Sequence, residues 1–175
     1  KYKGIDTAIT ALSRTGADRR PGAEPIRVIC VGDTEGDPDY GEAVRRHCRE
    51  AGVEDRFELL GWVSDERLGE LQGEVAATLC PSTYEGYGLS VTEGLAAGLP
   101  ALVSDIPPHR ETAGDAGLYF EPGDADRLAQ LLEEVGSDPE RRVGLAWNSR
   151  DRHAELVAAE RPWAVAIRSA LTELP

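Results

Sequence analysis

Two carboxylates, Glu85 and Glu93, stand with seven residues between them in the most informative stretch of this sequence. The segment between them contains Gly86 and Gly88, and glycines let a backbone turn tightly and approach a ligand closely. It follows an apolar run that predicts a buried strand, and it leads into a helix that we expect at 90–97. A helix start leaves backbone N–H groups unpaired, and together with the helix dipole they form an anion site. The stretch therefore predicts an anion-binding turn with an acidic side chain on either side.

The two acidic side chains would repel an anion if they faced it, so we expect them to bind hydroxyl groups instead. A vicinal diol offers two O–H donors to the two oxygens of a carboxylate, and hydrogen bonds to charged groups are the strong kind. A ligand with a polyol at each end of a diphosphate satisfies both carboxylates and the helix start. A nucleotide sugar has this shape.

Simpler interpretations of the same residues stay open. Glu93 could merely complement the helix dipole from the first turn, and Glu85 could be an ordinary loop carboxylate. The two glycines alone are weak evidence, because Val91 stands where the dinucleotide fingerprint has its third glycine. Nor is a pair of Glu so close in sequence typical of a glycosidase.

The elements that must position this turn alternate between strand and helix along almost the whole chain. Apolar, β-branched runs predict strands at 26–31, 57–63, 75–80, 101–104 and 118–120. Helical spacing, caps and prolines predict helices at 4–15, 39–51, 64–71, 90–97, around 110, at 125–135, from 139 onward and at 162–174. This order predicts an α/β fold, a Rossmann-like, doubly wound parallel sheet with helices on both faces. Such sheets bind ligands at the carboxyl ends of their strands.

Composition excludes several other classes of protein. Apolar residues make up 41% of the 175 residues, which argues against disorder, and no apolar run approaches the roughly 20 residues of a membrane span. A net charge of −13 disfavours a nucleic-acid partner. Cys30, Cys48 and Cys80 have no paired spacing, which indicates free thiols of a cytoplasmic protein and no zinc site. His109 lies in an expected crevice loop, where a ligand contact and a structural role both stay open.

The block from Pro81 to Pro100, with Glu85 and Glu93 inside it, closely resembles the signature of glycosyltransferase family 4. These are retaining, nucleotide-sugar-dependent enzymes of the GT-B fold. Lys3-Gly4 resembles the start of the family's donor domain, and the segment 57–63 resembles its base-binding strand. The resemblance covers nearly the whole chain, and it implies the carboxy-terminal half of a GT-B glycosyltransferase.

The resemblance also implies roles for individual residues. Glu85 would hold hydroxyls of the transferred sugar, and Lys3 would neutralise a phosphate and the charge of the leaving group. Glu93 would hold the ribose diol, and Val63 would meet the base. The remaining donor-binding residues belong to the turn itself: Gly86, Tyr87, Gly88, Leu89 and Ser90. No cofactor and no metal ion is implied.

Residues 1–175 are thus expected to form a single donor-binding domain, with the amino-terminal acceptor domain absent from this chain. The chain has no Met, which fits a segment of a longer protein. Its expected partners are a nucleotide-sugar donor and its own acceptor domain or an equivalent chain, and a membrane contact through that missing domain stays open. On its own the domain is expected to transfer nothing. The alternatives are a non-catalytic nucleotide-sugar-binding or interaction module and, ranked lower, a GT-B nucleotide-sugar epimerase.

Overall fold

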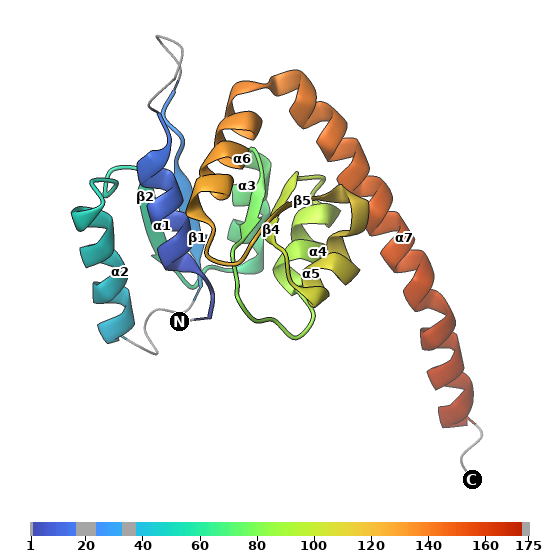
Figure 1. Ribbon diagram of the computed structural model, residues 1–175. Helices are drawn as coiled ribbons and strands as arrows, with labels where there is room; N and C mark the ends of the chain where they lie inside the picture. Colours follow the sequence, from blue (N-terminus) through green and yellow to red (C-terminus); the bar gives the residue numbers. More distant parts are fainter. Residues whose placement is uncertain (1, 17–23, 33–37, 173–175) are drawn as a thin grey trace.

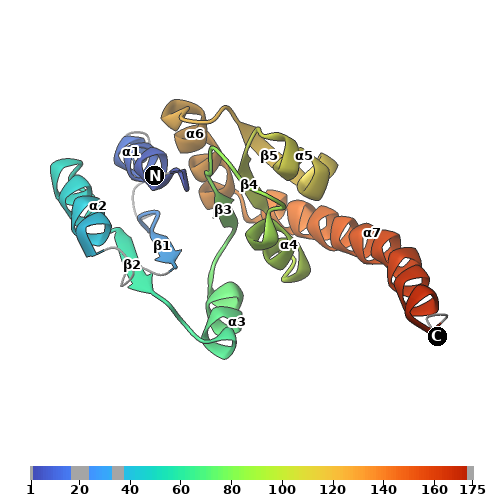
Figure 2. The ribbon, with the colours of Figure 1, turned by 90° about the horizontal axis from the view of Figure 1, so that it is seen from below.

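The computed structural model describes residues 2–16, 24–32 and 38–172 (Figure 1). Its strands are β1 (Val28–Val31), β2 (Phe57–Gly61), β3 (Thr78–Cys80), β4 (Ala101–Ser104) and β5 (Gly117–Phe120). All observed pairings are parallel, as expected: β1 pairs with β2, and β4 pairs with both β3 and β5. The hydrogen bonds thus form two groups of strands. Figure 2 shows β1 lying between β2 and β3, so the strands follow the spatial order β2-β1-β3-β4-β5.

Helices occupy both sides of these strands. They are α1 (Ile5–Arg14), α2 (Pro38–Glu50), α3 (Asp65–Glu74), α4 (Leu89–Ala96), α5 (Pro107–Ala113), α6 (Ala125–Ser137) and α7 (Pro139–Thr172), with a short 3₁₀ turn at Gly114–Ala116. In Figure 2, α1 and α6 lie on one side of the strands, and α3 and α4 lie on the other. This arrangement confirms the predicted doubly wound architecture.

The core forms where the apolar faces of these helices meet the strands. Leu128 and Leu131 of α6 are completely buried and Val135 is nearly so, as their helical spacing predicts. They pack with Leu102 of β4 and Phe120 of β5. All four residues of β4 are buried, which is typical of a central parallel strand covered on both faces.

Several predicted boundaries were wrong: the first strand starts at Val28 and not at residue 26, α3 runs on to Glu74, and three further differences have a clear local cause. The helix expected at 162–174 does not begin there, because α7 continues from Pro139 through Pro162 to Thr172, and residue 174 lies outside the described residues. A proline removes one N–H donor but does not by itself end a helix. The strand expected from Val75 starts at Thr78, since Val75 is the C-cap residue of α3. Strand β2 ends at Gly61, whose φ of 75° leaves the extended region, so Val63 follows the strand.

Candidate functional site

The start of α4 is built around Gly88. Its φ is 92°, a left-handed conformation that side chains disfavour, and no side chain caps the helix there. The helical hydrogen bonds begin with the N–H groups of Val91 and Thr92, which both donate to the Gly88 carbonyl. The N–H groups before them belong to the orphan donors of a helix start, and Leu89 and Ser90 are exposed. The turn that we predict to bind an anion is therefore an uncapped helix start.

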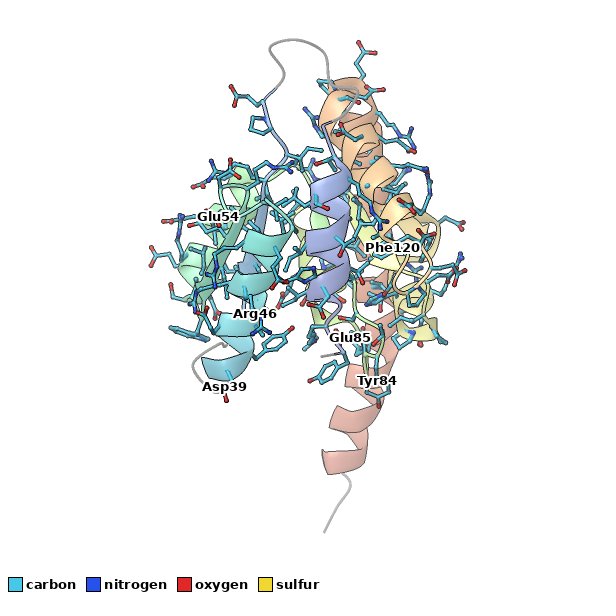
Figure 3. The ribbon with its side chains drawn as sticks, turned by 60° about the vertical axis from the view of Figure 1, so that its left-hand side comes forward. Asp39, Arg46, Glu54, Tyr84, Glu85 and Phe120 are labelled. Atoms are coloured by element: carbon cyan, nitrogen blue, oxygen red, sulfur yellow. The ribbon has the colours of Figure 1, made fainter. Side chains whose placement is uncertain are left out.

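Glu85 stands three residues before this helix start. Its Oε1 accepts hydrogen bonds from Lys3 Nζ at 2.7 Å and from Ser82 Oγ at 2.8 Å. The Glu85 side chain is one-fifth exposed and that of Lys3 is half exposed. The other oxygen, Oε2, makes no hydrogen bond with a described residue. Figure 3 shows Glu85 and Tyr84 beside the end of α1 at which that helix begins. The two residues expected to be catalytic are thus in direct contact.

Gly4 allows the chain to place Lys3 beside Glu85. Gly4, at φ 67°, is the N-cap residue of α1, and a Cβ built on it would lie only 1.8 Å from the Pro81 carbonyl oxygen. The chain on either side of this contact is also joined, because the Thr83 N–H donates to the Tyr2 carbonyl at 2.8 Å. The Lys-Gly pair of the sequence therefore has a physical basis: only a residue without a side chain lets α1 start against the loop that carries Glu85.

Electrostatics keep Glu85 ionised. Burial alone would raise its pKa, but the hydrogen bonds from Lys3 and Ser82 outweigh burial, so the pKa lies below the ordinary carboxyl value. An ionised carboxylate only accepts hydrogen bonds, which suits a group that binds hydroxyls.

Glu93 and Val63 lie apart from this ion pair. Glu93 is exposed on α4, and its side chain makes no hydrogen bond or ion pair with another described residue. Because α4 begins at Leu89, Glu93 is its fifth residue and lies beyond the first turn. The expectation that it lies in the first turn was wrong, and a dipole role is correspondingly weak. Val63 is half-buried in the connection between β2 and α3, and its neighbour Trp62 is 77% exposed.

Helix α5 supports the turn from behind, which the sequence did not reveal. Thr112 Oγ1 donates to the Tyr87 carbonyl at 2.8 Å. His109 lies on the same helix, not in a loop as expected, and is completely buried. Thr112 was missed because its partner Tyr87 becomes a neighbour only in the folded chain. Ser82 was missed although its partner Glu85 is only three residues away, because that spacing alone does not indicate a contact.

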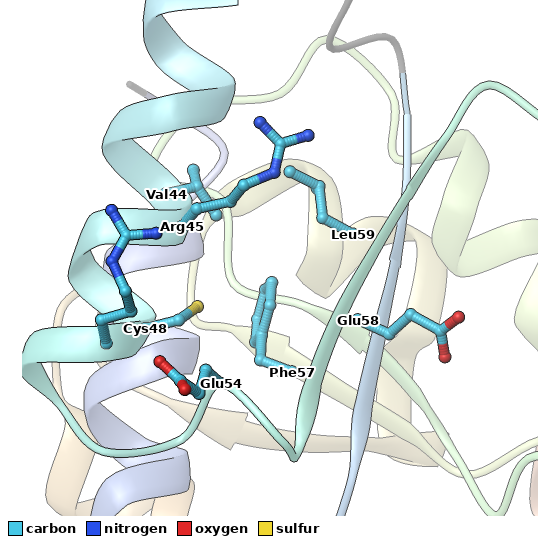
Figure 4. A pocket seen from close by; sticks show the side chains of 8 residues that line it. Val44, Arg45, Cys48, Glu54, Phe57, Glu58 and Leu59 are labelled. Atoms are coloured by element: carbon cyan, nitrogen blue, oxygen red, sulfur yellow. The ribbon is translucent and has the colours of Figure 1, made fainter.

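A hollow of about 520 Å³ lies elsewhere, between α2 and β2 (Figure 4). None of the expected site residues lines it. Its lining mixes arginines and glutamates with apolar side chains: Val44, Arg45, Cys48, Arg49, Glu54, Phe57, Glu58 and Leu59. One of these arginines, Arg49, is held by Glu42 at 2.9 Å. The chemistry that the sequence predicts is therefore not located in this hollow.

Two further observations concern the described residues. None of their helices combines the length and the apolar character that a bilayer crossing requires. Nor do His, Cys, Asp and Glu side chains gather there in groups of three or more that could hold a metal ion.

Known proteins resemble this chain in sequence and in fold. The family model of glycosyl transferases group 1 matches residues 1–152. The O-antigen chain mannosyltransferase B of Escherichia coli is 34% identical over 106 residues, which are 60% of this chain and 27% of the relative. The 2-deoxystreptamine glucosyltransferase of Streptomyces kanamyceticus is 29% identical over 147 residues, 80% of this chain and 35% of the relative.

Among solved structures, the Anabaena protein HepE in complex with UDP matches with a TM-score of 0.81 and 22% identity. The match covers 96% of this chain and 46% of HepE. The chain belongs to the glycosyl transferases group 1 family, and the comparisons confirm the predicted Rossmann-like GT-B fold class. It spans less than half the length of these relatives.

Proposed function

We propose that this chain is the donor-binding domain of a retaining glycosyltransferase, which moves a hexose from a nucleoside-diphosphate sugar to an acceptor hydroxyl. One observation carries the proposal: the uncapped start of α4 at Gly88 lies next to an ionised Glu85 that is paired with Lys3. The family supports transfer of a sugar. The names of two relatives, a mannosyltransferase and a glucosyltransferase, support a hexose.

The proposed roles follow from donors and acceptors that remain available. An ammonium group has three N–H donors, and Lys3 gives one to Glu85, so it can bridge that carboxylate to a phosphate oxygen. Glu85 Oε2 is available to hydroxyls of the sugar. Glu93, exposed and without a partner among the described residues, would take the ribose diol, and Val63 would lie against the base.

In the proposed reaction the bond between the sugar's anomeric carbon and the diphosphate oxygen breaks, and negative charge builds on the diphosphate. Lys3 and the N–H groups of Gly88, Leu89 and Ser90 would stabilise that charge. Fixed donors of this kind, aimed at charge that develops in the transition state, are a major source of rate enhancement. The acceptor hydroxyl would form the new bond with retained anomeric configuration.

The acceptor would bind to a further domain or chain, so we expect residues 1–175 alone to bind donors without transferring sugar. The matches to this chain cover only 27% and 35% of the two relatives, which supports a separate acceptor-binding part. We place the reaction in the cytoplasm. Turnover by this chain without an added partner would contradict this separation of donor and acceptor binding.

Calorimetric titration tests the proposal. UDP, GDP, ADP, UDP-glucose and GDP-mannose are titrated into the wild-type chain and into Lys3→Ala and Glu93→Ala. Each substitution removes a hydrogen bond to a charged group, so we expect a loss of about 1.5–3 kcal/mol of binding free energy. Glu140→Ala, which removes an exposed carboxylate in the first turn of α7, serves as the control and should bind like the wild type. If both site variants bind as tightly as the wild type, the site is assigned wrongly.

A further inference from the structure

His109 of α5 is held in one orientation and one tautomer. Its Nδ1 lies 2.9 Å from the Ser104 carbonyl oxygen and 3.1 Å from Ser104 Oγ. The Ser104 hydroxyl itself donates to the Ser82 carbonyl. Because a carbonyl oxygen only accepts hydrogen bonds, Nδ1 must carry a proton and donate it. In the neutral ring the other nitrogen, Nε2, is therefore an acceptor without a proton.

Nε2 of His109 is the one buried side-chain nitrogen or oxygen, among the residues that the structure describes, that has no hydrogen-bond partner. The whole residue is buried. A buried acceptor without a donor destabilises the folded state, and such groups in proteins call for an explanation. The sequence between Glu85 and Glu93 does not supply a donor for it.

The unpartnered edge of the ring faces the candidate site. Cδ2, the ring atom bonded to Nε2, lies 3.5 Å from the point that a Cβ of Gly88 would occupy. Gly86, which lies between Glu85 and Gly88 in the chain, is exposed, and a Cβ built there meets no atom within 4 Å. His109 is completely buried and Gly88 is buried as well, so a sugar hydroxyl reaches Nε2 only when the turn at the two glycines shifts as the ligand binds.

We propose that Nε2 of His109 accepts a hydrogen bond from a hydroxyl of the sugar bound at the turn from Glu85 to Gly88. The inference rests on the proposed function and adds a residue that recognises the sugar rather than the nucleotide. An unprotonated nitrogen requires an O–H or N–H donor. Sugar hydroxyls supply one, whereas the oxygens of an ionised diphosphate carry no proton. His109 of α5 and Glu85 of the loop before α4 would then both hydrogen-bond to the sugar.

Two substitutions separate the nitrogens of the ring. His109→Asn keeps an N–H group near the position of Nδ1 and has no atom at Nε2. His109→Gln reaches the position of Nε2 with a polar atom and loses the Nδ1 donor. We expect His109→Asn to weaken UDP-glucose or GDP-mannose binding roughly three- to tenfold, the worth of one neutral hydrogen bond. UDP and GDP should bind this variant as they bind the wild type, and His109→Gln should keep most of the affinity for the nucleotide sugars.

The outcomes are distinct. Unchanged affinity of His109→Asn for the nucleotide sugars overturns the inference, and so does an equal loss for UDP and UDP-glucose, which would indicate a phosphate contact or support of the turn. If the wild type binds nucleotide sugars and Glu93→Ala weakens them while His109→Asn does not, only the role of His109 fails. If the wild type binds none of these ligands, the proposed function fails together with the inference.

A measurement on the unsubstituted chain covers the case in which a variant does not fold. The imidazole ¹⁵N resonances of His109 are recorded with UDP and with UDP-glucose or GDP-mannose. We expect the Nε2 resonance to shift with the bound nucleotide sugar and not with UDP. An Nε2 resonance that is the same in both complexes overturns the inference.

Discussion

Two helices that each follow a strand, α3 after β2 and α4 after β3, begin in opposite ways. At α3, Ser64 has an extended backbone and its side chain accepts a hydrogen bond from the Arg67 N–H at 3.2 Å. At α4, Gly88 is left-handed and offers no side chain to any N–H group. A side-chain cap satisfies a donor within the fold. A glycine at this position leaves the first N–H groups of the helix without a side-chain acceptor.

The charges around the two helix starts also favour an anion at α4 and disfavour one at α3. The first turn of α3 carries Asp65 and Glu66, which already compensate the positive end of the helix and would repel an anion. The first turn of α4 carries no acidic residue, and Lys3 lies beside the loop that precedes it. One helix start is thus capped by its own sequence, whereas the other leaves backbone donors to which the proposed anionic ligand would bind.

The comparison depends on Gly4, which holds Lys3 against the loop before α4. Gly4→Ala places a Cβ 1.8 Å from the Pro81 carbonyl oxygen, so the start of α1 must move. We expect a loss of about 2–4 kcal/mol in the free energy of unfolding. Urea denaturation measures it, and calorimetry should show weaker UDP binding because Lys3 moves with the helix start.

Gly52→Ala is the matched control for this prediction. Gly52 has nearly the same φ, 66°, but a Cβ there meets no atom within 4 Å. It should lose only the cost of a left-handed side chain, about 1–2 kcal/mol, and keep its affinity for UDP. Equal losses of stability in the two variants would show that the contact between Gly4 and Pro81 contributes nothing.

The pair Ser64→Ala and Gly88→Ala tests the two helix starts directly. Ser64→Ala removes a cap and should cost about 1 kcal/mol of unfolding free energy, with no change in UDP affinity. Gly88→Ala meets His109, Thr112 and Val91 only at ordinary contact distances, so it should cost about 1–2 kcal/mol through its φ of 92°.

Binding then separates the two variants, although their stabilities are similar. In Gly88→Ala the turn must relax from the left-handed conformation that aims its N–H groups, so UDP should bind more weakly. The contrast between the helices would be refuted by a Gly88→Ala variant that binds UDP like the wild type, or by a Ser64→Ala variant that loses UDP binding.

Much of this arrangement could be predicted because the relevant signals are local. The apolar run before Pro81, the glycines at 86 and 88 and the cap at Ser64 each act on their immediate neighbours, and the corresponding elements lie close to where the sequence places them. The family resemblance added Lys3, which no local pattern singles out. The parallel pairing of the strands follows from the alternation of strands and helices.

The unpredicted part consists of contacts between residues far apart in the chain. The approach of Gly4 to Pro81 and the hydrogen bond from Thr112 to Tyr87 exist only after the strands have paired. The burial of His109 depends in the same way on α5 packing behind α4. The passage of α7 through Pro162 shows a different failure, since a proline favours a helix start without requiring one.

The smallest expected effect concerns the Lys3–Glu85 pair beside the start of α4, and how it changes the stability of the fold in acid. Hydrogen bonds from Lys3 and Ser82 lower the pKa of Glu85 in the folded chain despite its partial burial. A carboxyl group whose folded pKa is depressed contributes stability above its unfolded pKa, about 4.3, and loses that contribution as the pH falls through the folded value. Because the pair is partly exposed and screened, the contribution should stay below about 1 kcal/mol.

Urea unfolding between pH 7 and pH 3 measures this contribution. The free energy of unfolding should decline less steeply for Glu85→Gln than for the wild type, whereas Glu58→Gln should decline like the wild type. The difference should shrink in high salt, which screens exposed charges, and parallel curves for the wild type and Glu85→Gln would mean that the ion pair does not stabilise the fold.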